Sequence, residues 1–487
     1  MLKKYSSLIL LLLCYFSAMS QDIDSFRAEY EKFRKQAFST YSDFRDECNQ
    51  KYCEFLKSAW EYYQAGPIMQ NPFKDDNKPP VIYEWDDTIK DDTPVPFDDV
   101  IPAPTPDPQP QPISPISPTP ENNQLKVTIN FFNTELAIRA PQSRIKLSSC
   151  NGEDLAKAWE TMSGDAYNPL LTDCLEVRSF IGLCDWGYLL FIWHLSSTYL
   201  GENTNEATLL TAYIYSQSGY KMRLGEANGK LCLLFASKHM IYGAHCFEIG
   251  QDYFYPLNYD GGDGLNACNF AFNNEKSMSL YIPNEQKFAL SVSESRMLKA
   301  EGYPTSVNIA INESLVAFYS TYPTSEADNN FMTRWAMYAN TPLDSDVKKQ
   351  LYPALYSQLE GKTYPEAANI LLDFVQSAFV YEYDDKVWGG DRAFFAEESL
   401  YYPYCDCEDR SILFSRLVRD LLGLKVILVY YPGHLATAVR FDEYVTGDYI
   451  NLNGERYLVC DPTYIGAPIG ATMPDMDNAT ATVILLE

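Results

Sequence analysis

The chain has 487 residues, with 38 Lys and Arg against 65 Asp and Glu and a formal net charge of −27. This acidic balance argues against nucleic acid or an anionic membrane as a partner, because both are polyanions that attract basic surfaces. The length is sufficient for two or three domains, each with its own core.

The first twenty residues have the pattern of an export signal. Lys3-Lys4 give a positive start, an apolar run extends from Leu8 to Phe16, and Ala18-Met19-Ser20 forms a small-x-small cleavage site. A lipoprotein signal would need a small residue before Cys14, but leucines precede it. No later stretch approaches the roughly 18 apolar residues that span a bilayer. The sequence therefore predicts an exported protein, periplasmic or extracellular, with no transmembrane segment in its mature chain.

Cysteine usage leaves the disulfide pattern open. Removal of the signal takes Cys14 with it, so an odd number of the 12 cysteines remains. In an oxidising compartment some of these thiols should pair, and an odd count leaves at least one free. Buried reduced cysteines are an equally fair interpretation for many of them.

Residues 21–66 read as one amphipathic helix that ends at Gly66-Pro67. The helix is expected to pack on the body of the protein or on a second copy of itself, which would give self-association. Its apolar positions recur every three or four residues with charges between them: Phe26, Tyr30, Phe33, Ala37, Tyr41, Phe44, Cys48, Tyr52, Phe55 and Ala59.

Residues 67–123 are dense in proline and aspartate. Such a composition cannot bury a core and favours an extended, semi-rigid chain. The sequence predicts a spacer here that separates the first helix from everything downstream.

From residue 124 the pattern becomes globular, and an α+β fold is predicted for the rest of the chain. Residues 124–340 form the first expected α+β domain, and residues 341–487 form the second. The expected strands are Lys126–Phe132, Lys230–Ser237 and Gln251–Leu257, and the expected helices are Trp186–Leu200, Ala207–Ser216, Asp344–Glu360 and Pro365–Val380.

A thiol, an imidazole and a carboxylate follow one another at intervals of 27 residues, as Cys407, His434 and Asp461. Cys407 stands where a helical pattern begins that ends at Gly423. A helix start favours a thiolate through its unpaired N–H groups. The acidic Glu408-Asp409 pair opposes that thiolate, so a nearby imidazolium is needed to outweigh it.

His434 and Asp461 fall on strand-like segments. His434 follows the turn Pro432-Gly433 and opens one strand, and Asp461 comes directly after another, Arg456–Cys460. Neighbouring antiparallel strands can place the two side chains together, facing the helix start. The imidazole then acts as the base for Cys407, and the carboxylate orients the ring.

Other interpretations of these residues stay open. The thiol could be a buried core cysteine, the histidine a satisfied turn residue and the aspartate a turn cap. A zinc site of Cys405, Cys407, His434 and Cys460 is disfavoured, since Cys-x-Cys lacks the usual two-residue gap. No acidic loop of the calcium-binding kind is evident. No metal or other cofactor is therefore predicted.

The stretch from Pro365 to Pro474 resembles the transglutaminase-like family within the papain-like cysteine enzymes. The residues that carry the resemblance are Phe379-Val380-Tyr381-Glu382-Tyr383-Asp384, Asp406-Cys407-Glu408-Asp409 with Leu417, Leu421, Leu422 and Gly423 behind it, Gly433-His434, and Asp461-Pro462-Thr463-Tyr464. The resemblance implies a papain-like core in which a helix start bearing the cysteine packs on an antiparallel sheet. It also implies Cys407 as nucleophile, His434 as base and then acid, and Asp461 as the orienting residue.

The resemblance further implies acyl transfer on a protein or peptide substrate, through a thioester that water or an amine resolves. The family's usual Gly or Gln before the cysteine is replaced here by tyrosines, among them Tyr401 and Tyr402. One backbone N–H, that of Cys407, would serve the oxyanion, and Tyr401 or Tyr402 is the candidate side-chain donor.

A weaker version of the same progression lies upstream. Cys184, His239 and Asn258 follow in the same order, and Cys184 also opens a helix. The interval from Cys184 to His239 is 55 residues, and the Asp-Pro-Thr-Tyr signature is missing. A degenerate structural copy within residues 124–340 is predicted.

Two functions follow from these patterns. The first is an exported transglutaminase-like cysteine enzyme that acts on carboxamide or peptide bonds by hydrolysis or acyl transfer. The alternative is a catalytically inactive binding or structural module that keeps the transglutaminase fold.

Overall fold

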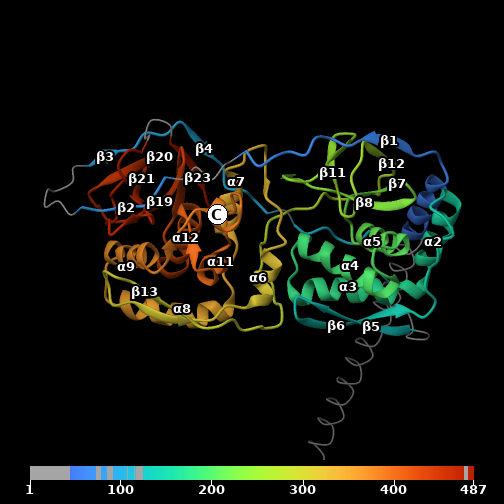
Figure 1. The fold of residues 1–487 in the computed structure, drawn as a ribbon, viewed down its shortest axis with the longest axis horizontal. Coiled ribbons are helices and arrows are strands. Elements are labelled where there is room, and N and C mark those ends of the chain that lie inside the picture. The colour runs from blue at the N-terminus through green and yellow to red at the C-terminus, as the bar shows by residue number, and fades with distance from the viewer. Residues whose placement is uncertain are drawn as a thin grey trace, which may run out of the picture.

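The structure is a computed structural model that describes residues 44–72, 78–84, 92–106, 108–113, 116, 124–476 and 481–487. The predicted signal and residues 21–43 of the predicted helix lie outside the described residues. The fold is α+β, as the sequence predicts. Figure 1 shows two lobes side by side, each with a curled sheet that has helices packed beneath it.

The first lobe contains a six-stranded sheet, a hairpin and a group of helices. In spatial order its sheet is β1 (Glu61–Gln64), β12 (Gly264–Cys268), β7 (Met222–Ala227), β8 (Lys230–Ala236), β11 (Asp252–Pro256) and β10 (Phe247–Ile249). The hairpin is β5 (Gln124–Phe131) with β6 (Thr134–Pro141), and the helices are α2 (Gly152–Ser163), the 3-10 turn η1 (Asp165–Tyr167), α3 (Asn168–Ile181), α4 (Asp185–Leu200) and α5 (Asn205–Gln217).

The second lobe contains a seven-stranded sheet. In spatial order this is β3 (Thr93–Pro94), β20 (Asp448–Leu452), β21 (Glu455–Cys460), β19 (His434–Arg440), β18 (Val426–Tyr431), β23 (Thr482–Leu485) and β4 (Asp99–Ile101). The helices that follow the first lobe are α6 (Glu313–Tyr319), α7 (Thr333–Asn340), α8 (Ser345–Leu359), α9 (Tyr364–Ser377), α10 (Asp384–Val387), α11 (Ala396–Tyr401) and α12 (Cys407–Leu422). Short pairs complete the fold: β13 (Arg296–Lys299) with β14 (Ser306–Ile309), β9 (Met240–Ile241) with β15 (Ser325–Glu326), β16 (Val380–Tyr381) with β17 (Tyr404–Cys405), and β2 (Val81–Ile82) with β22 (Tyr464–Ile465).

Five strands of each main sheet follow the same spatial order. The order is β10-β11-β8-β7-β12 in the first lobe and β20-β21-β19-β18-β23 in the second, with every neighbouring pair antiparallel. Ranked along the chain within its lobe, each set therefore runs 3-4-2-1-5. A strand from the N-terminal segment is then added beside the last of the five, β1 in one lobe and β4 in the other. This shared order is what a duplicated fold predicts.

The helix before the sheet and the first hairpin of the sheet in the first lobe also correspond to those of the second lobe. α5 packs on β7 and β8, as α12 packs on β18 and β19. All residues of α5 from Ala207 to Gln217 are buried, so it is a core helix. Both hairpins turn through two residues that end in a glycine with positive φ, Gly229 at 78° and Gly433 at 73°. Glycine reaches this left-handed region without the steric cost that a Cβ brings.

The prediction of one helix over residues 21–66 is wrong at its C-terminal end. The helix ends at Leu56, and Glu61–Gln64 form the edge strand β1 paired with β12. Tyr62 and Tyr63 favour a strand, and pairing with β12 satisfies the backbone there. The described part of the helix packs on the body of the protein, where the rings of Tyr52 and Trp159 lie 4.4 Å apart.

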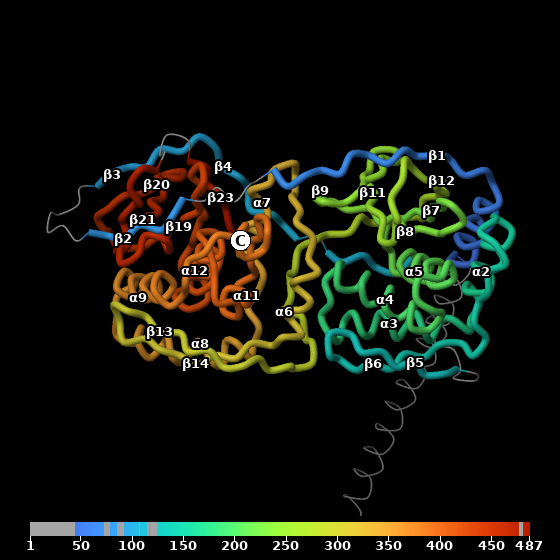
Figure 2. Tube along the Cα trace, viewed as in Figure 1, coloured from blue at the N-terminus to red at the C-terminus, as the bar shows by residue number. Residues whose placement is uncertain are grey.

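The predicted spacer over residues 67–123 is wrong for its described parts. β2, β3 and β4 pair in parallel with β22, β20 and β23, and Val95 and Ile101 are buried in the second lobe. Figure 2 shows this segment crossing from the first lobe to the second and back. Proline fits such edge strands because it has no N–H that would need a partner. The composition of residues 67–123 therefore excludes a hydrophobic core within this segment, but it does not exclude pairing with the sheet of another part of the chain.

The second core begins before residue 341, where the sequence placed a domain boundary. Leu298 and Ile309, on β13 and β14, are buried in one apolar cluster with Leu351 and Phe414. The β13–β14 hairpin therefore belongs with α8 and α12.

None of the helices in the described ranges is both long and apolar enough to cross a bilayer. All cysteines of the described residues, from Cys48 to Cys460, are unpaired thiols. Apolar packing rather than cross-linking therefore stabilises this part of the chain.

Candidate functional site

The first turn of α12 holds Cys407 at a fixed place. Asp406 is the residue before the helix and Cys407 is its first residue. Asp409 accepts hydrogen bonds from the backbone N–H groups of Asp406 at 3.2 Å and Phe394 at 2.8 Å. This use of the Asp409 carboxylate to pair two buried N–H groups explains an acidic residue in the first turn.

The hairpin between β18 and β19 places His434. Tyr431 and His434 are opposite each other across the turn, and the positive φ of Gly433 lets the chain reverse there. His434 is therefore the first residue of β19, as the sequence predicts, and its side chain is fully buried.

Asp461 meets His434 from the neighbouring strand. Cys460 ends β21, and its partner on β19 is Thr437, so Asp461 lies one step beyond, beside the start of β19. His434 Nε2 lies 2.8 Å from Asp461 Oδ2. The other carboxylate oxygen accepts the Thr463 backbone N–H at 2.8 Å, and the Asp461 carbonyl accepts a hydrogen bond from Gln376 on α9. The predicted imidazole–carboxylate pair is thus present and its orientation is fixed.

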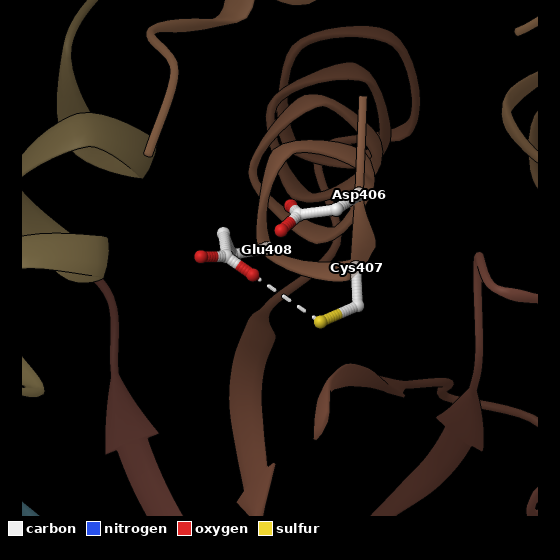
Figure 3. Close-up of side chains that lie close together, drawn as sticks. All are labelled: Asp406, Cys407 and Glu408. Carbon is white, nitrogen blue, oxygen red and sulfur yellow. Dashed lines mark hydrogen bonds between the residues drawn. The ribbon is translucent and has the colours of Figure 1, made fainter. Parts of the chain in front are cut away.

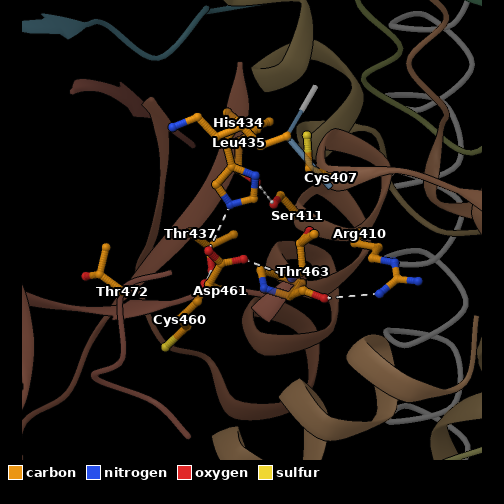
Figure 4. A network of polar contacts seen from close by, with 12 residues as sticks. Cys407, Arg410, Ser411, His434, Leu435, Thr437, Cys460, Asp461, Thr463 and Thr472 are labelled. Atoms are coloured by element: carbon orange, nitrogen blue, oxygen red, sulfur yellow. Dashed lines mark hydrogen bonds and ion pairs between the residues drawn. The ribbon is translucent and has the colours of Figure 1, made fainter. Parts of the chain in front are cut away.

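The thiol points to a different partner. Cys407 Sγ donates to Glu408 Oε2 at 3.2 Å, as Figure 3 shows, and no hydrogen bond joins it to His434 within the described part of the chain. His434 Nδ1 is buried and, among the described residues, makes no hydrogen bond. In Figure 4, Cys407 lies on the side of the ring that carries Nδ1, away from Asp461. The free nitrogen is therefore the one that faces the helix start.

The surroundings of Cys407 favour the neutral thiol. Burial raises its pKa well above the ordinary value, and the charges of Glu408 and Asp406 raise it further. The backbone N–H of Leu435 acts in the opposite direction. The thiolate expected at a helix start is thus opposed by burial and by Glu408, as the sequence indicated, and by Asp406 in the place expected for Asp409.

Buried cations near Cys407 were not predicted from the sequence. Arg334, on α7, forms an ion pair with Asp391 and lies 3.8 Å from Glu408. Arg410 donates to the carbonyl oxygens of Gln376 at 3.0 Å and Phe379 at 2.9 Å. Arg334 comes from a segment far from the triad in sequence, so no local pattern could have indicated it.

Potential metal ligands gather in two places among the described residues. The side chains of Asp406, Cys407 and Glu408 form one group, and those of Asp384, Asp391 and Glu408 form the other, each with its ligand atoms within 4.8 Å. The guanidinium of Arg334 already supplies positive charge to the second group. Neither group contains His434 or Cys460, so the structure does not assemble the zinc set considered from the sequence.

The oxyanion candidates Tyr401 and Tyr402 pack with other aromatic side chains. Their rings lie 5.0 Å apart, and Tyr402 also contacts Trp388 at 4.8 Å. Tyr381, on β16, lies within electrostatic reach of the thiol: burial raises the pKa of its hydroxyl, and the charge of Cys407 raises it further. Tyr381 is part of the segment that carried the resemblance, but its own position could not be read from the sequence.

The upstream set needs correction at two of its three positions. Cys184 precedes α4 and contacts the Tyr322 hydroxyl at 3.7 Å, and the ring of His239 lies 4.8 Å from that of Tyr281. The positions that match the triad in the shared strand order are instead Asn205, the first residue of α5, and Lys230, the first residue of β8.

Only Asn258 was assigned to the matching position from the sequence. It falls opposite the third residue of β8, as Asp461 falls opposite the third residue of β19. Asn205 Oδ1 accepts the Leu231 N–H at 2.9 Å, which corresponds to the approach of the Leu435 N–H to Cys407. The first lobe thus has Asn, Lys and Asn where the second has Cys, His and Asp. It lacks a thiol nucleophile at this position.

Comparison with known proteins finds no matching family model, no matching curated protein and no matching solved structure. The functional interpretation of the triad therefore depends on the residues and geometry of this chain.

Proposed function

We propose that the chain is an exported transglutaminase-like cysteine enzyme with a papain-like core in its second lobe. The enzyme acts on carboxamide or peptide bonds of a protein or peptide substrate. The observation that carries the proposal is the 2.8 Å contact of His434 Nε2 with Asp461 Oδ2, which leaves buried Nδ1 on the side of Cys407.

The proposed chemistry uses the two ring nitrogens differently. With Asp461 ionised, Nε2–H donates to the carboxylate, so Nδ1 carries the lone pair that accepts the Cys407 proton. The thiolate then attacks the carbonyl carbon of the substrate amide and a C–S bond forms. The C–N bond breaks as the imidazolium returns its proton to the leaving nitrogen, which departs as ammonia or an amine.

The thioester is resolved by the reverse sequence. Water or an amine gives a proton to His434 Nδ1 and attacks the thioester carbon. The C–S bond then breaks, and the imidazolium returns the proton to the sulfur of Cys407. Water gives a carboxylic acid, and an amine gives a new amide. Hydrolysis is the default outcome, because water is always present whereas an amine needs a pocket that positions it.

The oxyanion needs donors beside Cys407. We assign one to the backbone N–H of Cys407 and the second to the Tyr381 hydroxyl, in place of Tyr401 and Tyr402. A preorganised donor pair of this kind stabilises the charge that develops on the carbonyl oxygen.

The second candidate function is a binding or structural module with a transglutaminase fold and no activity. Burial of the thiol favours it, since Cys407 is 1% exposed and donates to Glu408. The two functions differ in their dependence on His434, because the enzyme needs it as the base for Cys407 and an inactive module does not.

Thiol labelling with iodoacetamide near neutral pH separates these functions. The enzyme predicts that Cys407 reacts faster than Cys405, a buried thiol two residues away that serves as the internal reference. The change His434→Ala should remove the difference. A faster reaction of Cys407 that persists in His434→Ala would contradict the enzyme. Ammonia release from a glutamine peptide, with and without a primary amine, then distinguishes hydrolysis from transfer.

A further inference from the structure

A short segment of the N-terminal region lies against the turn before His434 and against β22, the short strand that follows Asp461. We call this segment, residues Lys78–Glu84, the strap. It contacts Gly433, directly before His434, and Tyr464, three residues after Asp461. The strap therefore touches the catalytic loops on both sides of the imidazole–carboxylate pair.

The backbone of Lys78 is held at both of its polar groups. Its N–H donates to the Gly433 carbonyl at 2.8 Å. Its own carbonyl oxygen accepts the Tyr381 hydroxyl at 3.2 Å. A carbonyl of the strap thus accepts the hydrogen bond of the Tyr381 hydroxyl, the group that we propose as a donor to the substrate oxyanion.

The rest of the strap continues as an added strand. Val81 and Ile82 pair in parallel with Tyr464 and Ile465, and the Tyr83 N–H donates to the Ile465 carbonyl at 2.9 Å. Val81 and Tyr83 face the protein and pack against Tyr464, whereas Ile82 is 76% exposed. The side chains therefore alternate between the protein and solvent, as in any half-buried strand.

The residues of the strap suit an extended conformation. Pro79 and Pro80 favour extended backbone and lack N–H groups that would need partners. An extended peptide substrate needs the same three contacts that the strap makes. These are a carbonyl at an oxyanion donor, an N–H at the residue before the base, and alternate side chains in an apolar site. Peptides that bind by strand addition use this combination of backbone pairing and side-chain pockets.

We infer that the strap occupies the site at which an extended peptide substrate binds, and that strap and substrate compete for it. The inference rests on the proposed function and specifies its substrate class and its regulation. The buried state of the triad is consistent with it: Cys407, His434 and Asp461 are each 1% exposed, so a substrate reaches them only after a covering element moves. The strap is held by its backbone bonds, by two inward side chains and by the Lys78 ammonium, which donates to the Asp475 carbonyl at 2.6 Å. A competing peptide can replace the backbone bonds and the inward side chains.

The test loosens the strap without changing the triad. In the double variant Val81→Glu and Tyr83→Glu, both inward side chains become charged and leave the apolar site at Tyr464. The matched control is Ile82→Glu, which adds the same charge to the same strand on its exposed side. The readout is the rate at which iodoacetamide labels Cys407, with Cys405 as internal reference.

The double variant should label Cys407 at least tenfold faster than the wild-type chain, and Ile82→Glu should not. A synthetic peptide of residues 78–84, added to the double variant, should slow the labelling again. A folded double variant that labels at the wild-type rate would overturn the inference. If that variant does not fold, Lys78→Pro removes the N–H donated to Gly433 and the ammonium that donates to the Asp475 carbonyl. An unchanged labelling rate in that variant has the same meaning.

The strap and the proposed function fail in different ways. Faster labelling in the double variant that is unaffected by an added His434→Ala, with no ammonia released from a glutamine peptide, supports the strap and contradicts the enzyme. Equal ammonia release by the wild-type chain and the double variant supports the enzyme and contradicts competition by the strap.

Discussion

The Cys407 thiol donates a hydrogen bond to Glu408, its neighbour in the first turn of α12, at 3.2 Å. The proposed nucleophile is therefore paired with a carboxylate rather than with the imidazole. This pairing holds the thiol in its neutral form, because an adjacent negative charge opposes ionisation. Activation requires the thiol to turn from Glu408 to the free nitrogen of His434.

Replacing Glu408 by Gln should increase the reactivity of Cys407. Burial is the main cause of the raised thiol pKa and the Glu408 charge is the next, so the neutral amide should lower that pKa. If the pKa of the Cys407 thiol falls by one, labelling near neutral pH becomes about tenfold faster. The rate of alkylation against pH measures the shift. Glu398→Gln, a buried carboxyl paired with Arg392, is the matched control and should leave the profile in place.

Substitutions at Asp461 should separate orientation from charge. Asp461→Asn has one oxygen for two donors, His434 Nε2 and the Thr463 N–H, so its activity should lie between those of the wild-type chain and Asp461→Ala. Asp461→Ala removes the acceptor and should cost about 100-fold or more, since the ring then loses its fixed tautomer. Rates of ammonia release from a glutamine peptide give both values. Equal losses in the two variants would show that Asp461 does not orient the ring.

A buried carboxyl in the second lobe should make stability depend on pH. Burial raises the pKa of Glu397 from 4.5 to about 8. Between these values the carboxyl is protonated in the folded chain and ionised in the unfolded chain. Unfolding then releases a proton, so the free energy of unfolding falls as pH rises through this window, by up to about 1.4 kcal/mol per unit.

The variant Glu397→Gln removes this titration and keeps an acceptor for the Asp344 N–H, which donates to Glu397 at 2.6 Å. Its Tm should change less between pH 5 and pH 8 than that of the wild-type chain. Curves of Tm against pH that run parallel for the variant and the wild-type chain would contradict the assignment of this pH dependence to Glu397.

The two hairpin glycines provide a matched pair of substitutions. Gly433→Ala and Gly229→Ala each place a Cβ at positive φ, at 73° and 78°, and should each cost about 1–2 kcal/mol of stability. Denaturant unfolding measures this cost. Only Gly433→Ala should also slow ammonia release, because the turn positions His434, whereas the matching turn of the first lobe precedes Lys230.

Local patterns predicted the elements that carry the triad. Helical period and a terminal glycine placed α12 from Cys407, and strand-like runs placed β19 and β21. The 27-residue intervals did not show that His434 and Asp461 touch; the antiparallel register of β19 and β21 brings them together. Long-range pairing of this kind is set by the whole sheet.

The remaining features depend on contacts between distant segments. Arg334 reaches Glu408 from α7, and Lys78 reaches Gly433 from a proline-rich segment that looked like a spacer. The correspondence of Asn205 with Cys407 appears only in the order of the strands, because no shared residue type marks it. Composition and periodicity describe neighbouring residues only, so they do not predict contacts between segments that are distant in the sequence.

Capture of the acyl-enzyme tests the central claim most directly. The chain with Val81→Glu and Tyr83→Glu is mixed with a glutamine peptide, quenched in acid and digested, and the fragment with Cys407 is weighed by mass spectrometry. A transglutaminase-like enzyme predicts a peptide adduct on Cys407, formed with release of one ammonia and absent when His434 is Ala. A folded chain that labels readily with iodoacetamide at Cys407 but forms no adduct and releases no ammonia would contradict the claim.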